Sequence, residues 1–174
     1  MTAPAPIHLP DAAAIRAMLP DLTDILVDVV DGGGGVSFMA PLARANAEAF
    51  WRGVADDVDA GSKVLLVAEH EGRAAGTVIL QLLWQPNQPH RAEVAKLLVH
   101  SRARRQGIAR QLMARLENEA RTRGRTLLLL DTVSGGAAEA LYRSMGWIEV
   151  GRVPGFALSP YGALDDTTFF YRVL

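Results

Sequence analysis

The chain has 174 residues, a length that allows one domain with a sizeable core and is short for two domains without a linker, so we expect a single domain over residues 1–174. Its 18 Lys and Arg residues nearly balance 19 Asp and Glu residues, and a net charge of −1 predicts no general attraction to nucleic acid or to an anionic membrane. The absence of cysteine excludes disulfides, a thiolate nucleophile and a cysteine zinc site.

The first third of the chain predicts helices. Met1 to Pro10 lacks the basic start and apolar stretch of a signal peptide, so we expect a cytoplasmic location. Asp11 to Val30 has apolar residues at helical spacing, and Pro20 divides this segment into two pieces. Four glycines follow and predict a flexible loop on the substrate side. Pro41 to Ala60 reads as the next helix, because proline suits a first helical turn and a glycine follows the last residue.

The middle of the chain predicts strands and then a long helix. Lys63 to Glu69 and Arg73 to Leu83 are rich in residues that favour strands, and Glu71-Gly72 between them suits a tight hairpin. Arg91 to Val99 is a third strand. A basic turn then leads into an amphipathic helix from Gly107 to Arg123. No apolar run reaches the length that a bilayer requires, so we expect no membrane partner.

The last third predicts strands around one helix. Thr126 to Leu130 is a continuous apolar run, which indicates a strand buried on both faces, with Asp131 at its end. Ala137 to Met145 is helical. Trp147 to Val153 and Thr167 to Val173 are expected as closing strands around a loop rich in proline and glycine. The four histidines lack the spacing that puts two metal ligands on one helix face, so we expect no metal.

The segment from Val94 to Ala109 carries the strongest chemical signal. A strand runs through a turn with several arginines directly into a helix. A helix N-terminus offers unpaired N–H groups and about half a positive charge, which suits a pyrophosphate, although such a cluster also occurs as a plain solvated turn. The segment has neither the three glycines of G-x-G-x-x-G nor the G-K-[ST] of a Walker loop. It therefore predicts a phosphate-bearing cofactor of another kind.

This segment resembles the acyl-CoA signature of the GNAT superfamily, Q/R-x-x-G-x-G/A. Arg104, Gly107 and Ala109 stand at its first, fourth and sixth positions. Downstream, Leu141-Tyr142 before Gly146-Trp147 looks like the L-Y-x-x-x-G-F segment of the same superfamily. The resemblance implies the α/β GNAT fold, a mixed and largely antiparallel central sheet flanked by helices. It also implies that acetyl-CoA enters a splay between the two central strands, around Leu97 and Leu129.

The same resemblance implies two sets of residues that bind coenzyme A. The backbone groups of Leu97, Leu98 and Val99 would pair with the pantetheine arm like an additional strand and hold the thioester carbonyl. The pyrophosphate would lie at the turn and the helix start, formed by Arg104, Arg105, Gln106, Gly107, Ile108, Ala109 and Arg110. Many members carry Asn where Gly135 stands, so one side-chain contact with the cofactor is missing here.

Three catalytic residues follow from the resemblance. Glu93 and Asp131 are expected near the acetyl group, as candidates to accept the proton of the amine directly or through water. Between the two, Glu93 is favoured for the proton and Asp131 for positioning the acceptor. Tyr142 matches the tyrosine that protonates the departing CoA sulfur. Each residue also has a structural interpretation: Asp131 as a turn cap, Glu93 on a solvated strand face, and Tyr142 as a core aromatic. Lys96 is expected as a solvated or ion-paired side chain.

Further stretches extend the resemblance towards acetyltransferases that confer toxin resistance. They are Val36 to Ala40, Arg91 to Val94 with Lys96-Leu97, Leu130 to Thr132 before Ala138 to Ala140, and Val153 to Phe156. They imply an acetyl-CoA-dependent N-acetyltransferase that acts on the amine of a small molecule, with an amino-acid-like toxin or antibiotic among the candidates. Acetylation of a protein N-terminus or lysine, and a non-catalytic acyl-CoA-binding module, remain alternatives. The oligomeric state stays open, a homodimer included.

Overall fold

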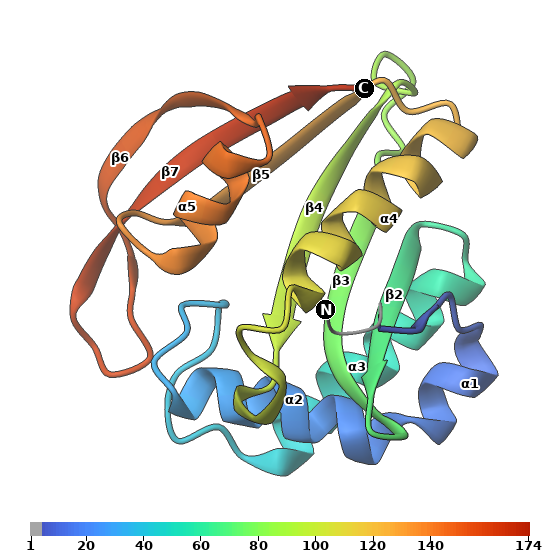
Figure 1. Ribbon diagram of the computed structural model, residues 1–174, viewed down its shortest axis with the longest axis vertical. Helices are drawn as coiled ribbons and strands as arrows, with labels where there is room; N and C mark the ends of the chain where they lie inside the picture. The colour runs from blue at the N-terminus through green and yellow to red at the C-terminus, as the bar shows by residue number, and fades with distance from the viewer. Residues whose placement is uncertain (1–4) are drawn as a thin grey trace.

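A computed structural model describes residues 5–174, in which one seven-stranded sheet carries helices on both faces (Figure 1). Residues 1–4, which begin the segment without an expected targeting signal, lie outside the described part. The elements in chain order are β1 (Ile7–His8), α1 (Ala12–Ala17), α2 (Leu19–Asp31), α3 (Arg44–Asp59), β2 (Lys63–His70), β3 (Arg73–Leu82), β4 (Arg91–Val99), a 3-10 turn (Ser101–Ala103), α4 (Ile108–Thr122), β5 (Leu127–Val133), α5 (Ala137–Ser144), β6 (Ile148–Leu158) and β7 (Leu164–Val173).

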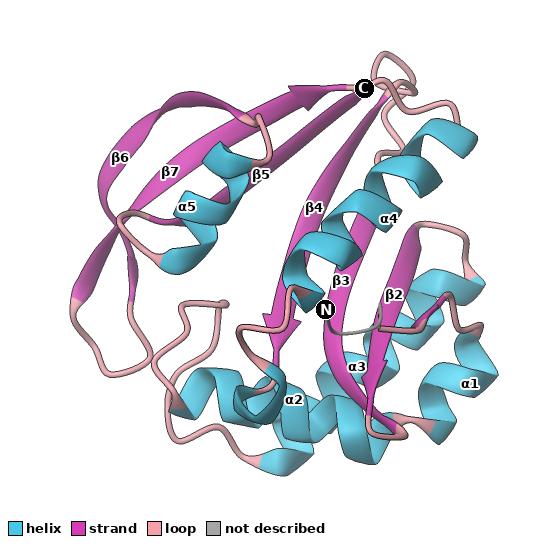
Figure 2. Cartoon of the chain, viewed as in Figure 1, coloured by secondary structure: helices cyan, strands magenta, loops and turns pink. Residues whose placement is uncertain are grey.

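The strands lie in the order β1-β2-β3-β4-β5-β7-β6 (Figure 2). All neighbouring pairs are antiparallel except β4 and β5, which are parallel. The expected mixed, largely antiparallel sheet flanked by helices is confirmed. The helix α4 is the connection that two parallel neighbours require. Within the described residues, no helix is long and apolar enough to cross a membrane.

Two cores cover the two faces of the sheet. Helices α1, α2 and α3 bury one face, and α4 and α5 bury the other (Figure 1). Strand β2 shows how one strand supplies both cores, because its side chains alternate in direction. Val64 and Leu66 pack on the side of α4, whereas Leu65 and Val67 pack on the side of α2 and α3. The long apolar runs of the sequence therefore mark strands that are buried on both faces.

Four of the expected element boundaries are wrong, and one of them is the start of β7, which lies at Leu164 rather than Thr167. Helix α3 starts at Arg44 rather than Pro41, because Ala43 still has extended backbone angles and leaves Pro41 in the loop. Strand β5 continues through Val133, since Asp131 pairs with Phe169 of β7; Asp131 is therefore neither at the strand end nor a turn cap.

Strand β6 also runs further than expected, because it passes through the proline and glycine at 154–155. The register of β6 against β7 shifts between Val153 and Ala157, and this bulge accommodates the proline without a ladder hydrogen bond. The N–H group of Gly155 donates instead to the carboxylate of Asp166 at 2.8 Å. The break that Pro20 was expected to cause is confirmed, since α1 ends at Ala17 and α2 begins at Leu19.

Candidate active site

The site begins where strands β4 and β5 separate. They pair only through Arg91–Glu93 and Leu127–Leu129, near their first residues. Beyond that point β5 pairs with β7 and β4 pairs with β3, so the two strands splay apart (Figure 1). Among the described strands, none pairs with the β5-facing edge of β4 from Val94 onward. Backbone N–H and C=O groups on that edge are therefore available to a ligand.

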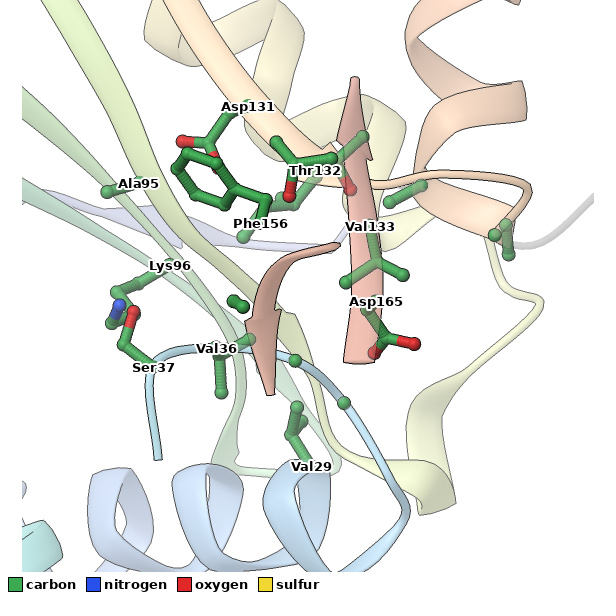
Figure 3. A pocket seen from close by; sticks show the side chains of 18 of the residues that line it. Val29, Val36, Ser37, Ala95, Lys96, Asp131, Thr132, Val133, Phe156 and Asp165 are labelled. Atoms are coloured by element: carbon green, nitrogen blue, oxygen red, sulfur yellow. The ribbon is translucent and has the colours of Figure 1, made fainter. Parts of the chain in front are cut away.

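A cavity of about 450 Å³ lies at this splay (Figure 3). Its walls come from the loop after α2, from β4 and β5, from the start of α5 and from the β6–β7 hairpin. Three of the lining residues carry charged side chains: Lys96, Asp131 and Asp165. The glycines at 33–35, expected as a substrate-side loop, also line it.

A bulge in β4 shapes one wall of the cavity. The register between β3 and β4 shifts at this point, and Lys96 adopts a left-handed backbone with φ 53°. The buried hydroxyl of Thr77 donates to the carbonyl of Lys96 at 3.0 Å and holds the bulge. A bulge reverses the alternation of side chains along a strand. As a result Val94 packs on the side of α4, while Leu98 packs on the opposite side.

The bulge brings the ammonium group of Lys96 against two aromatic rings. Its Nζ lies 5.9 Å from the ring centre of Phe38 and 5.7 Å from that of Phe50. Burial lowers the pKa of Lys96, and the negative charge of Asp131 opposes that shift. The expected solvated or ion-paired lysine is thus partly buried and lines the cavity. Sequence reasoning gave it no role, because neither ring is near it in the chain.

The two carboxylates expected to serve as bases lie in different surroundings. Asp131 lines the cavity, where partial burial raises its pKa and the charge of Lys96 counteracts the rise. Glu93 is not one of the lining residues, its side chain is 43% exposed, and its Oε1 lies 3.3 Å from Nη1 of Arg91. Only Asp131 is therefore in direct reach of a ligand in the cavity.

Tyr142 of α5 belongs both to the core and to the cavity wall. Its ring packs 5.9 Å from Trp147 and 6.1 Å from Phe170, measured between ring centres, and the residue lines the cavity. Burial, and then the negative charge of Asp131, raise the pKa of its hydroxyl. The phenol therefore stays protonated at neutral pH, which is the state that a proton donor needs.

The basic turn follows the end of β4. Arg105 and Gly107 have left-handed backbone angles, φ 62° and 78°, and α4 starts at Ile108 without a side-chain cap. Three arginines fold back on the protein: Arg102 donates to the carbonyl of Ala74, Arg104 to that of Val99, and Arg110 to the hydroxyl of Ser144. Of the residues expected to bind the cofactor, Leu97 lines the cavity, and the turn lies outside its lining.

Asp28 of α2 joins the basic turn to the helix before the glycine loop, and sequence reasoning missed it. Its carboxylate accepts from the backbone N–H of Ser101 at 2.8 Å and from the hydroxyl of Ser101 at 2.6 Å. Arg104 lies 3.5 Å from the same carboxylate. No local pattern signals this contact, because the partners are far apart in the sequence. The contact fixes the turn relative to the helix that precedes the glycine loop.

Comparison with known proteins defines the class. The family model described as the acetyltransferase (GNAT) family matches residues 37–147, which hold β4, the basic turn, β5 and Tyr142. An uncharacterised N-acetyltransferase of Azospirillum brasilense is 36% identical over 115 residues, which are 65% of this chain and 67% of that protein. The chain therefore belongs to the GNAT acetyltransferase family. It is an acyltransferase, and acetyl-CoA is its cofactor.

Two solved structures show the same fold over nearly the whole chain. A ribosomal-protein-alanine N-acetyltransferase from Brucella melitensis has a TM-score of 0.74 and 27% identity, covering 97% of this chain and 99% of its own. A phosphinothricin acetyltransferase from Sinorhizobium meliloti, in complex with acetyl-CoA, has a TM-score of 0.79 and 20% identity, covering 99% and 89%. Their names point to different acceptors, so the acceptor of this chain must be argued from its own cavity.

Proposed function

We propose that the protein transfers the acetyl group of acetyl-CoA to the amine of a small molecule. The observation that carries the proposal is the cavity at the splay, where an unpaired strand edge meets Asp131 and Tyr142. Its volume of about 450 Å³ lies in the range of small-molecule sites, about 300–1,000 Å³. A thioester on the strand edge and an amine beside the carboxylate would both fit the lining.

Coenzyme A would bind along β4 and at the basic turn. The pantetheine arm would pair with the free edge at Leu97, Leu98 and Val99, as an added strand does. The pyrophosphate would meet the amides from Arg105 to Arg110. Two features support this placement: left-handed Gly107 has no side chain to block the approach, and α4 starts without a side-chain cap.

Asp131 replaces Glu93, which the sequence favoured, as our candidate for the residue that accepts the proton of the amine, because only Asp131 lines the cavity. An alkylamine with a pKa near 10.4 costs roughly 4.6 kcal/mol to deprotonate at pH 7, whereas an α-amine with a pKa near 8 costs only about 1.4 kcal/mol. Burial raises the pKa of Asp131, which brings it closer to the pKa of the amine and makes the carboxylate a stronger base. Glu93, outside the lining, would act only through water. Tyr142 would give its proton to the CoA thiolate as it leaves.

The acceptor that we favour is an amino-acid-like amine. The stretches that resemble the tabtoxin-resistance acetyltransferase, from Val36 to Ala40 and from Val153 to Phe156, flank or line the cavity. The acetyltransferase of the same fold from Sinorhizobium meliloti is named for phosphinothricin, which is not a protein acceptor. The Brucella protein is named for a protein acceptor, so a peptide that begins with alanine belongs in any test of this proposal.

We also propose a homodimer that uses the sheet edge at β6. Strand β6 ends the strand order, and an edge strand with exposed apolar side chains readily pairs with another chain. Exposed apolar residues on β6 and at the start of β7 are Ile148, Val150, Val153, Phe156, Leu158 and Leu164. Light scattering should give a dimer for the wild type and a monomer for Val150→Lys. A wild-type monomer at micromolar concentration would contradict the proposal.

The direct test is release of the CoA thiol. Because the chain has no cysteine, a thiol reagent detects only coenzyme A. The acceptors should include amino acids, polyamines, aminoglycosides and the peptide with N-terminal alanine, at pH 7 to 9. We expect turnover with amino acids well above the hydrolysis rate without acceptor. Turnover with the peptide alone would favour a protein acceptor, and no turnover with any amine would refute the proposal.

A further inference from the structure

We propose that Lys96 binds a carboxylate of the acceptor, so that the enzyme selects amines that also carry a carboxylate. The amine of the same molecule would then lie towards Asp131. This inference rests on the proposed function, since it names the chemistry of the acceptor. Its basis is the position of Lys96 in the cavity.

Lys96, which lines the cavity, has an unfavourable backbone conformation. Two residues of the lining other than glycine have positive φ, Lys96 at 53° and Ser37 at 74°. Such conformations cost roughly 1–3 kcal/mol and persist where the surrounding structure enforces them. Both side chains belong to the cavity lining (Figure 3). The strained backbone at these two positions thus lies at the wall of the cavity.

The surroundings of Lys96 hold its charge in place but leave its hydrogen bonds unused. The faces of Phe38 and Phe50 stabilise the cation without accepting a conventional hydrogen bond. Among the ion pairs of the described residues, none includes Lys96, whereas Lys63 pairs with Asp57 at 2.7 Å. An ammonium group has three donors, and a partly buried one without an anionic partner gains from a carboxylate supplied by a ligand.

The charges in the cavity fit a zwitterion. Lys96 is the one cation among the lining residues, and Asp131 and Asp165 are the anions. Burial lowers the pKa of Lys96 and raises that of Asp131, and the charge of each residue opposes the shift of the other. A small amino acid placed between them would meet an anion with its amine and a cation with its carboxylate.

The test compares acceptors in pairs, each amino acid with its carboxamide, on the wild type and on Lys96→Met. The two acceptors differ in amine pKa, but this difference cancels when the same pair is compared on two enzymes. We expect Lys96→Met to lower kcat/KM for the amino acid by about 10- to 100-fold, mainly through KM, as for a lost hydrogen bond between charged groups. The carboxamide should change less than about threefold.

Two control variants separate this role from others. Lys63→Met removes a positive charge outside the lining. It should leave unchanged the ratio of kcat/KM for the amino acid to kcat/KM for its carboxamide. Lys96→Arg keeps the charge and should recover part of the preference for the amino acid. Binding of acetyl-CoA to Lys96→Met, measured by calorimetry, should equal that of the wild type, which shows that the variant is folded.

Several outcomes would overturn the inference. If Lys96→Met lowered kcat/KM by the same factor for the amino acid and for its carboxamide, Lys96 would contribute to the fold or to the chemical step and would not bind the carboxylate. If the wild type acetylated carboxamides as well as amino acids, the inference would fail while the proposed function stood. If the wild type acetylated no amine at all, the proposed function itself would fail, and the inference with it.

Discussion

Strands β2 and β3 bury most of their residues, whereas β6 of the same sheet exposes nearly all of its own. Helices cover both faces of the sheet at β2 and β3, and this half holds most of the core. The arm formed by β5, β7 and β6 joins β4 through three residue pairs. The well-packed half supports the fold, and the thin junction leaves room for ligands.

The comparison predicts that changes at the junction affect catalysis far more than stability. The largest effect should come from Asp131→Asn, because a general base contributes about 10²- to 10⁴-fold. We expect a loss of at least tenfold in kcat/KM at pH 7, a smaller loss for Glu93→Gln, and a double variant that falls short of the product of the two. The matched control is Asp165→Asn, a second carboxylate of the lining.

The role of Asp131 as a base also predicts how kcat/KM depends on pH. A carboxylate base is active when deprotonated, so the rate falls as the pH drops through its pKa. Burial raises the pKa of Asp131, so the acid limb of kcat/KM should lie above the ordinary aspartate value of about 3.9. Asp131→Asn should abolish that limb. If both single variants lose well under tenfold and the rate follows the titration of the free amine, neither carboxylate is the base.

The next largest effect is expected for Tyr142→Phe, about 10²-fold in kcat. The hydroxyl is needed only when the thiolate leaves, so the affinity for acetyl-CoA should change little. The ring and its packing on Trp147 and Phe170 are kept, so the melting temperature should also be nearly unchanged. Tyr171→Phe, which alters a tyrosine outside the lining, is the control. Wild-type turnover in Tyr142→Phe would leave this residue with a purely structural role.

A smaller effect, a loss of about tenfold in the affinity for acetyl-CoA, is expected when the glycine before α4 is replaced by alanine. Gly107 and Gly124 flank this helix, both with left-handed backbone, φ 78° and 69°, and neither is closer than 3.7 Å to an obstacle for an added Cβ. Alanine at either position should cost about 1 kcal/mol of stability. Calorimetry should show weaker binding of acetyl-CoA only for Gly107→Ala. Equal affinities in the two variants would remove the basic turn from the cofactor site.

Local sequence patterns predicted the bounds of several elements better than the contacts at the junction. The strand expected over Arg91 to Val99 has those bounds, and the helix expected from Gly107 to Arg123 is observed as Ile108–Thr122. Periodic burial and glycine ends suffice for such elements. The motif also identified the turn and Tyr142 as candidates. These features depend on residues that are adjacent in the chain.

The features of the junction that were missed depend on distant residues. The bulge at Lys96 is held by Thr77, and its ammonium group lies against Phe38 and Phe50, which precede it by many residues. Asp131 lies inside a strand only because β7 pairs with it from the far end of the chain. An apolar run cannot signal such pairings, since they form only in the folded sheet.

The central claim, that acetyl-CoA and the amine meet in the splay between β4 and β5, has one most direct test. Because the chain has no cysteine, a single one can be introduced at Ala95 in the cavity lining, with an exposed control at Ala60. Acetyl-CoA should slow maleimide labelling of Ala95→Cys by tenfold or more and leave that of Ala60→Cys unchanged, and only labelled Ala95→Cys should lose acetyl transfer. Equal labelling rates of Ala95→Cys with and without acetyl-CoA, or full activity after labelling, would contradict the claim.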